Sequence, residues 1–163
     1  MDLVGDKLKA KFGEDIYSAE MNYDFPVFVV NRDKIIEIIQ YLYEDGDMGY
    51  QFLTTLCGLH YPENKGKELG VMYQLHNLPQ NKRIRLKTFF GLNNAVVPTL
   101  TNIFSTANWM ERETYDFYGI VFKGHPNLKR ILNVDDMVDF PLRKEFPLED
   151  PTREDKNDTM FGR

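Results

Sequence analysis

Two stretches near the middle of the chain, residues 71–75 and 84–90, place a side chain suited to burial at every second position, and all of these are apolar except Thr88. A period of two predicts β-strands with one face buried and the other half exposed to water. The link between them, residues 77–82, is polar and contains Pro79, which is typical of a hairpin loop. The pattern therefore predicts an antiparallel pair of strands.

A helical pattern comes before this pair. Apolar side chains recur at helical spacing from Ile35 to Leu42, and Gly46 follows them. Asn31 and Asp33 are both suited to cap the start, because a short polar side chain accepts a hydrogen bond from a first-turn amide. We expect one amphipathic helix here, ending before the glycine.

The other segments complete the predicted fold. Residues 24–30 are rich in β-branched and aromatic side chains and predict a strand, and residues 6–12 predict a short helix. Residues 50–56 fit a helix and a strand equally. Another helix is expected to start at Thr99 or Thr101. Half-exposed strands need cover on one face only, so the sequence predicts a two-layer α+β fold. Its sheet is mixed or antiparallel, with helices packed on one face.

The segment from Trp109 to Tyr118 crowds charged and aromatic side chains into what the spacing predicts to be a helix. Asn108 and Glu111 have the spacing of a capping box, in which each side chain bonds the other residue's backbone amide. Gly119 is placed to end the helix in a left-handed turn.

The charges on this helix have two interpretations. Arg112 and Asp116 are four residues apart on one face, with Glu113 nearby, and Glu111 and Tyr115 form a second such pair. The cluster either holds charged groups of a neighbouring protein or is a solvated face with weak ion pairs.

The acidic residues of this helix also raise the possibility of an enzyme. Two carboxylates divide acid and base roles when their surroundings separate their pKa values. Glu111 and Glu113 are two residues apart, however, and point away from each other on a helix. No nucleophile lies near them or near Asp116, so the pattern argues against acid–base catalysis.

Three further motifs follow the helix, at residues 124–126, 128–132 and 141–147. The last two set basic side chains among apolar ones, and Pro141 and Pro147 discourage a helix in the final block. A segment of this kind either docks onto another protein, with its cations facing acidic groups, or lies over its own domain.

By composition the chain divides into three parts. Residues 1–107 form an α/β core, and residues 108–147 continue the same domain with the charged helix and the extended segment. Residues 148–163 form a charged tail with little to bury. We expect this C-terminal docking tail to become ordered only against a partner.

Composition excludes several classes of function. A net charge of −5 argues against nucleic-acid binding, and no apolar run is long enough to span a bilayer. The N-terminus lacks the pattern of a signal peptide, so we expect a cytoplasmic chain.

One cysteine, Cys57, cannot form an internal disulfide or hold an iron–sulfur cluster. The histidines His60, His76 and His125 show no metal-ligand spacing, and no glycine-rich phosphate loop is present, so neither a metal nor NADH or a flavin is expected.

The motifs of residues 109–147, in this order and with these spacers, resemble those of the 30-kDa subunit of proton-pumping NADH:quinone oxidoreductase, respiratory complex I. Weaker similarity runs through residues 49–50, 56–62, 73–76 and 83–86. The positions that match the family pattern are Glu111, Arg112, Glu113, Tyr115, Asp116, Gly119, Ile120, Gly124, His125, Pro126, Leu128, Arg130, Leu142, Arg143, Lys144 and Pro147.

The resemblance implies a structural subunit without catalytic, cofactor-binding or metal-binding residues of its own. The implied place is the peripheral arm of the complex, on the cytoplasmic face of the bacterial inner membrane. Its neighbours there are the large subunit that forms the quinone site and the small subunit that carries the terminal iron–sulfur cluster. FMN and iron–sulfur clusters then belong to other subunits, and membrane association is indirect. The chain end at Arg163 resembles the unfused form of the subunit. The alternative is the homologous subunit of a membrane-bound hydrogenase or a ferredoxin-driven complex.

Some positions depart from the family pattern. His60 stands where an aspartate is frequent, Met137 where tryptophan is usual, and Asp139-Phe140 where Gly-His is usual. Phe117-Tyr118 also differs from the usual pair before Gly119. These departures concern local packing around Met137 and Phe140.

Overall fold

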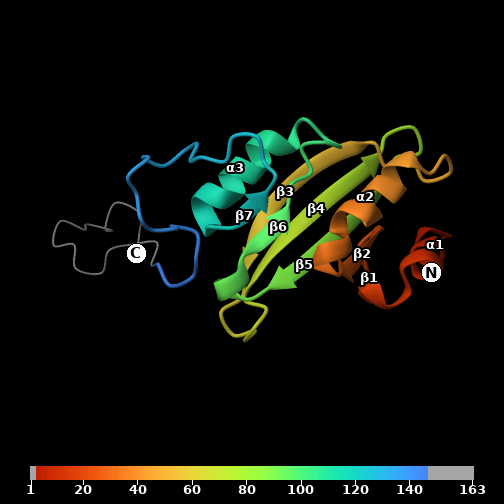
Figure 1. Cartoon of the computed structure of the whole chain (residues 1–163). Coiled ribbons are helices and arrows are strands. Elements are labelled where there is room, and N and C mark those ends of the chain that lie inside the picture. Colours follow the sequence, from red (N-terminus) through yellow and green to blue (C-terminus); the bar gives the residue numbers. More distant parts are fainter. Residues whose placement is uncertain (1–2, 147–163) are drawn as a thin grey trace, which may run out of the picture.

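The computed structural model describes residues 3–146 of the 163, and a five-stranded sheet is its largest element (Figure 1). The strands lie in the order β1-β2-β5-β4-β3, and each neighbouring pair is antiparallel except β2 and β5, which are parallel. Their bounds are Ile16–Asn22 for β1, Phe25–Val30 for β2, Phe52–His60 for β3, Leu69–Asn77 for β4 and Lys82–Phe90 for β5.

The predicted antiparallel pair is confirmed as the β4–β5 hairpin. Tyr73 lies opposite Leu86 and Leu75 opposite Ile84, so the alternating apolar side chains of both strands reach the same face of the sheet. Asn81 adopts a left-handed backbone conformation (φ 50°) in the connecting turn, where a short polar residue tolerates it.

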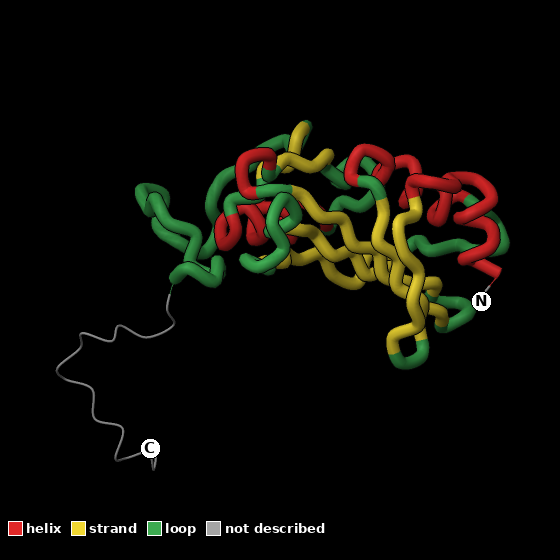
Figure 2. The backbone as a smooth tube through the Cα atoms, turned by 90° about the horizontal axis from the view of Figure 1, so that it is seen from below, coloured by secondary structure: helices red, strands yellow, loops and turns green. Residues whose placement is uncertain are grey.

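Three α-helices cover that face. They are α1 (Leu3–Phe12), α2 (Ile35–Glu44) and α3 (Ala107–Tyr118), and short 3₁₀ turns occupy Gly13–Asp15, Arg32–Lys34 and Leu92–Asn94. The side chain of Asn31 accepts from the amide of Asp33 and caps the 3₁₀ turn that precedes α2, whereas α2 itself begins after Lys34 without a side-chain cap. Figure 2 shows the helices on one side of the sheet and none on the other. The two-layer α+β fold is therefore confirmed.

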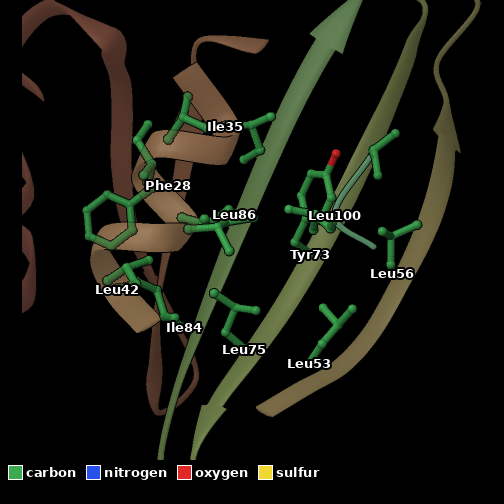
Figure 3. Packing of buried hydrophobic residues seen from close by; sticks show 14 of the residues in the cluster. Phe28, Ile35, Leu42, Leu53, Leu56, Tyr73, Leu75, Ile84, Leu86 and Leu100 are labelled. Atoms are coloured by element: carbon green, nitrogen blue, oxygen red, sulfur yellow. The ribbon is translucent and has the colours of Figure 1, made fainter. Parts of the chain in front are cut away.

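The core lies between the helices and the sheet. Ile35 and Leu42 of α2 project toward Phe28, Leu86 and Ile84 (Figure 3). The apolar stripe at helical spacing and the apolar positions at strand spacing thus bury each other, which is the main source of folding free energy in a domain of this size.

Two segments, residues 50–56 and the segment from Thr99 to α3, adopt structures that their local sequence pattern does not predict. Residues 50–56, which fit two states, belong largely to strand β3, which pairs with β4 along its whole length. The prediction of a helix that starts at Thr99 or Thr101 is wrong. Strand β6 (Val96–Pro98), which pairs in parallel with β7 (Val121–Lys123), ends just before Thr99, and isolated turns follow it as far as α3.

The predicted capping box at the start of α3 is also wrong. The helix begins at Ala107, so Asn108 lies inside it, and the Glu111 side chain bonds Thr99 and Leu100 instead of the Asn108 backbone. Gly119 ends the helix in a left-handed conformation (φ 72°), as predicted. The tail of residues 148–163 and Pro147 lie outside the described residues.

Candidate functional site

Most charged side chains of α3 are buried. Glu111 and Asp116 are fully buried, and Arg112 is 8% exposed. Burying a charge is costly unless the charge is paired and hydrogen-bonded. The interpretation of this helix as a solvated face of weak ion pairs is therefore wrong. Each buried group holds a segment that lies beyond the helix, and these contacts define the candidate site.

Asp116 organises the loop of residues 124–140, which we call the anchored loop. Its Oδ2 accepts from the backbone amides of Ile131 (3.0 Å), Leu132 (2.8 Å) and Asn133 (2.9 Å). Its Oδ1 accepts from the Asn133 side chain at 3.0 Å. Hydrogen bonds to the ionised carboxylate outweigh the cost of burial, and they hold the pKa of Asp116 far below its ordinary range.

Arg130 completes this network from within the anchored loop. Its guanidinium donates to Asp116 Oδ1 at 2.7 Å and also bonds the carbonyls of Met137 and Asp139. One buried ion pair therefore connects the end of α3 with both halves of the loop. The guanidinium also lies over the ring of Phe140, 5.2 Å from its centroid.

Arg112 does not pair with Asp116, contrary to the expectation from their spacing of four. Its Nε donates to the carbonyl of Lys129 at 3.1 Å, and its Nη2 donates to the carbonyl of Arg130 at 3.0 Å. Helix spacing brought the two side chains to one face, but the anchored loop lies between their polar ends and bonds both. The charges of α3 thus satisfy the backbone of an irregular segment.

Glu111 holds the segment on the other side of the helix. Its Oε1 accepts from the Leu100 amide at 2.6 Å, and its Oε2 lies 2.5 Å from the hydroxyl of Thr99. Burial raises the pKa of Glu111 to about 7, although both hydrogen bonds oppose the rise. The nearby Tyr73 hydroxyl is buried without a hydrogen-bond partner among the described residues.

His125 fixes the start of the anchored loop. Its Nε2 lies 3.1 Å from the carbonyl of Asn108, and its Nδ1 accepts from the amide of Asn127 at 3.0 Å. These contacts assign the proton to Nε2. Gly124, just before it, has a φ of 87°, and Pro126 follows. The segment forms a turn, and the imidazole of His125 bonds the backbone of α3.

Residues 141–146, which we call the strap, lie against the domain. Arg143 Nε donates to the carbonyl of Tyr118 at 2.8 Å, and its guanidinium stacks on Phe140 at 4.7 Å. The amide of Lys144 donates to Nδ1 of the buried His60 at 2.9 Å. Of the two interpretations of this segment, a chain end over its own domain describes Arg143 and the Lys144 backbone.

Close approach of neighbouring segments makes glycine necessary at the end of α3 and at one position of β3. A Cβ on Gly119 would lie 2.6 Å from the Phe140 ring and 2.7 Å from the Arg143 guanidinium. A Cβ on Gly58 would lie 2.4 Å from the ring of Tyr118. Helix α3 thus sits unusually close to β3 on one side and to the strap on the other.

The anchored loop leaves large apolar side chains in solvent. Leu132 is 65% exposed and Val138 is 86% exposed, and Val134 lies between them in sequence with similar exposure. Trp109 of α3 and Leu142 of the strap are also exposed. Figure 1 shows the loop and strap, in blue, projecting beyond α3 at the end of the molecule opposite the N-terminus.

The remaining charged and aromatic residues of α3 lie apart from one another. Glu113 is exposed, and the ring of Tyr115 packs on Phe140 with centroids 6.4 Å apart. Glu111 and Asp116 are buried against separate partners. Among residues 3–146, no group of three His, Cys, Asp or Glu side chains is arranged to hold a metal ion. Sequence reasoning missed Thr99 and Asn133, because nothing in their local patterns marks them.

Within the described residues no helix has the length and apolar character needed to cross a bilayer.

Known proteins are similar to this chain in sequence and in fold. Residues 28–152 match the family described as "Respiratory-chain NADH dehydrogenase, 30 Kd subunit". A relative from Mycolicibacterium gilvum, named as a subunit of NADH-quinone oxidoreductase, is 37% identical over 90% of this chain and 67% of its own length. A relative of the same name from Geotalea uraniireducens is 34% identical over 91% of this chain and 88% of its own length.

Two solved structures have the same fold. The trypsin-resistant fragment (1-134) of Nqo5 superposes with a TM-score of 0.66 and 31% identity, over 77% of this chain and 96% of that fragment. A chain of the archaeal membrane-bound sulfane sulfur reductase superposes with a TM-score of 0.70 over 88% of this chain and 86% of its own length. At 24% identity the latter likeness concerns the fold alone.

The chain is an α+β domain in which buried charges of α3 hold a loop with exposed apolar side chains. The family match extends over most of that domain, including all of α3 and the anchored loop. The chain belongs to the family of 30-kDa subunits of respiratory-chain NADH dehydrogenase. It spans about two thirds of the length of the mycobacterial relatives that it matches.

Proposed function

We propose that this chain is a structural and assembly subunit in the peripheral arm of a proton-translocating NADH:quinone oxidoreductase. Its family, and the names of relatives that are 34% and 37% identical to it, support this assignment. In this role the chain carries no catalytic residue. It fixes the relative positions of subunits that pass electrons from NADH to quinone. The FMN and iron–sulfur clusters then belong to those subunits.

The observation that carries the proposal is the use of buried charge to shape a surface loop. A buried ion pair is a poor source of stability, since desolvation of both charges offsets most of their attraction. The Asp116–Arg130 pair instead satisfies backbone groups of the anchored loop. That loop keeps Leu132 and Val138 in water, where they gain nothing for the isolated domain. A fixed loop with exposed apolar side chains suits a partner surface.

We place the anchored loop against the large subunit that forms the quinone site and the small subunit that carries the terminal iron–sulfur cluster. The same assignment puts the chain on the cytoplasmic face of the inner membrane, attached through the complex. The strap continues from the anchored loop along α3, and Leu142 extends the exposed apolar surface. Lys144 offers its ammonium group to the same partners.

The test introduces a charge into the loop and compares it with the same change elsewhere. Leu132→Asp places a carboxylate on the anchored loop, and Leu78→Asp is the matched control, because Leu78 is 58% exposed in the β4–β5 turn. Each variant is expressed in the native host with an affinity tag and purified in mild detergent. The eluate is analysed for co-purifying subunits and for NADH:quinone activity.

We expect Leu132→Asp to lose co-purifying iron–sulfur and quinone-site subunits together with the activity. The control should retain both, and both variants should unfold at the wild-type temperature. Equal recovery of the complex with the two variants would show that the anchored loop is not the docking site. A wild-type chain that elutes alone, under conditions that preserve the complex, would refute the assembly role itself.

The homologous subunit of a membrane-bound hydrogenase or ferredoxin-driven complex is the alternative. The fold is shared with a chain of an archaeal respiratory membrane complex, so the fold does not distinguish them. The electron donor of the complex distinguishes the two proposals. Oxidation of NADH by the purified complex supports the main proposal, and oxidation of reduced ferredoxin without NADH activity supports the alternative.

A further inference from the structure

The face of the sheet opposite the helices has its own chemical character. Strand register places Thr55, Cys57, Met72 and Gln74 on this face, together with alternate residues of β5. None of the three helices covers it (Figure 2). We call it the open face. Most of its side chains are half-buried.

A row of cations runs along the middle of the open face. Arg83, Arg85 and Lys87 alternate with the buried Ile84 and Leu86 on β5, so all three project to the same side. Residues two apart on a strand are separated by roughly 7 Å, and three positive charges therefore extend over roughly 13 Å. Strands lie on both sides of β5, which places this row in the centre of the sheet.

These cations form no ion pair with the described carboxylates, unlike some other cations of the chain. Lys7, Lys34 and Arg130 each form an ion pair with a carboxylate. Within residues 3–146, no carboxylate forms an ion pair with any member of the β5 row. Among the strand residues on this face, Glu20 of the outer strand β1 is the acid, and Glu113 of α3 approaches Cys57 at the opposite border.

The central cation is held in place before any partner binds. Arg85 Nε donates to the side-chain oxygen of Gln74 at 2.9 Å, and the Gln74 amide nitrogen bonds the carbonyl of Ile84. The guanidinium also lies 4.8 Å from the centroid of the Phe25 ring. A positioned guanidinium loses little conformational freedom when it binds a carboxylate, which favours association.

We propose that the open face docks an acidic segment of a partner protein, with carboxylates placed over Arg83, Arg85 and Lys87. This inference rests on the proposed function, because it names a second surface used in the same assembly. The whole chain carries a net charge of −5, so an unbalanced positive row is local and not a consequence of composition. Complementary charge of this kind selects a partner and fixes its register more than it adds affinity.

The same features disfavour other occupants. A second copy would bring an identical positive row to this face, and like charges would oppose each other in a two-fold interface. Nucleic acid requires a broader basic field than three cations in a chain of net negative charge. A lipid surface is favoured by apolar side chains that project outward, and along β3, β4 and β5 only Phe52 is a large, exposed apolar residue on this face.

The first experiment reverses the two outer charges. Arg83→Glu with Lys87→Glu changes the row and leaves Arg85 in its hydrogen bonds. Lys65→Glu with Lys67→Glu makes the same change of charge in the exposed β3–β4 connection and is the matched control. Both double variants are introduced into the native complex, and loss of the tagged subunit is followed over time against an excess of untagged wild-type chain.

The expected result is loss from the complex at least roughly tenfold faster for the β5 variant than for the control, which corresponds to the coupling of one or two close charge pairs. Equal rates for the two variants would overturn the proposal. Thermal unfolding of the purified variants should stay within a few degrees of the wild type, because Arg83 and Lys87 make no ion pair with the described residues that the reversal would break.

A second experiment identifies the occupant. Phe52→p-benzoylphenylalanine puts a photoreactive ring at an aromatic position on the same rung of the sheet as His76 and Arg83. Irradiation of the intact complex should join this position to one acidic peptide of another subunit. Crosslinks to lipid, to a second copy of this chain or to no other molecule would each refute the proposal.

The two proposals fail in different ways. If the wild-type chain never enters a complex, the proposed function itself is wrong. If the Leu132→Asp variant is lost from the complex, while the β5 variant assembles normally and the open face gives no protein crosslink, only the inference about the open face fails. The two surfaces lie on different elements, so the variants do not share a contact.

Discussion

The replacement of Glu111 by glutamine gives the sharpest test of the electrostatics of α3. The carboxyl group is fully buried between Thr99, Leu100 and the helix, and no cation among the described residues is bonded to it. Glutamine has the same shape. Its oxygen can still accept from the Leu100 amide, and its nitrogen can donate to the Thr99 hydroxyl. The substitution therefore removes the titration and keeps the hydrogen bonds.

The expected magnitude follows from the pKa of Glu111. Burial raises it from 4.5 to about 7, and the difference corresponds to about 3 kcal/mol. A raised pKa means that the folded state binds the proton more tightly than the unfolded state. The associated stability is complete below pH 4.5, falls as the pH rises between 4.5 and 7, and is absent above about pH 7.

The assay is denaturant unfolding of the full chain at pH 5 and pH 8, for the wild type and Glu111→Gln. Between pH 5 and pH 8 the free energy of unfolding of the wild type should fall by about 2 kcal/mol more than that of the variant, because only the wild type must ionise a buried group. Glu113→Gln is the control, since Glu113 is exposed on the same helix. If the free energies of unfolding of wild type and Glu111→Gln differ by the same amount at both pH values, the proposed titration of Glu111 is refuted.

Three further substitutions test the contacts around α3. Asp116→Asn removes the charge that holds three amides of the anchored loop. It should lower the free energy of local opening at residues 131–133 by about 3–5 kcal/mol, which is measured as faster hydrogen exchange of these amides. Because the pKa of Asp116 is depressed, its contribution is present above the ordinary value of 3.8 and is lost as the pH falls below it, and the asparagine variant should lack this acid step. Gly119→Ala should cost at least about 1–2 kcal/mol in denaturant unfolding, from its left-handed backbone alone. Gly58→Ala should destabilise by about 1–3 kcal/mol through a contact with an aromatic ring, whereas Gly46→Ala, with open space around it, should stay within about 0.5 kcal/mol of the wild type.

The sequence predicts those parts of the fold in which one repeating pattern decides the structure. Apolar side chains recur at every second position from Leu69 to Leu75 in β4 and at Ile84 and Leu86 in β5, and α2 carries an uninterrupted apolar stripe. Residues 50–56 stay undecided because their apolar positions fit both periods. Strand β3 is selected by pairing with β4, and an irregularity in register between Leu53 and Thr55 breaks the local alternation.

The errors around α3 share one physical cause. Local rules assign Asn108 and Glu111 to a capping box, and Arg112 and Asp116 to an ion pair, because these residues have the required spacing. In the structure each buried side chain bonds a segment from elsewhere in the chain. A spacing rule sees only the helix itself. It cannot anticipate that residues 99–100, before the helix, and the loop of residues 124–140, after it, bring their amides and carbonyls to these side chains.

This return of the loop explains why charged residues occupy the buried face of α3. An irregular segment has no neighbouring strand to bond its backbone, so its amides require side-chain acceptors. Asp116 supplies acceptors for three of them, and Arg130 supplies donors for the carbonyls of Met137 and Asp139. An apolar pair would bury as much surface and leave these groups unsatisfied. The charges therefore allow the loop to hold one shape before a partner arrives, which lowers the entropy cost of assembly.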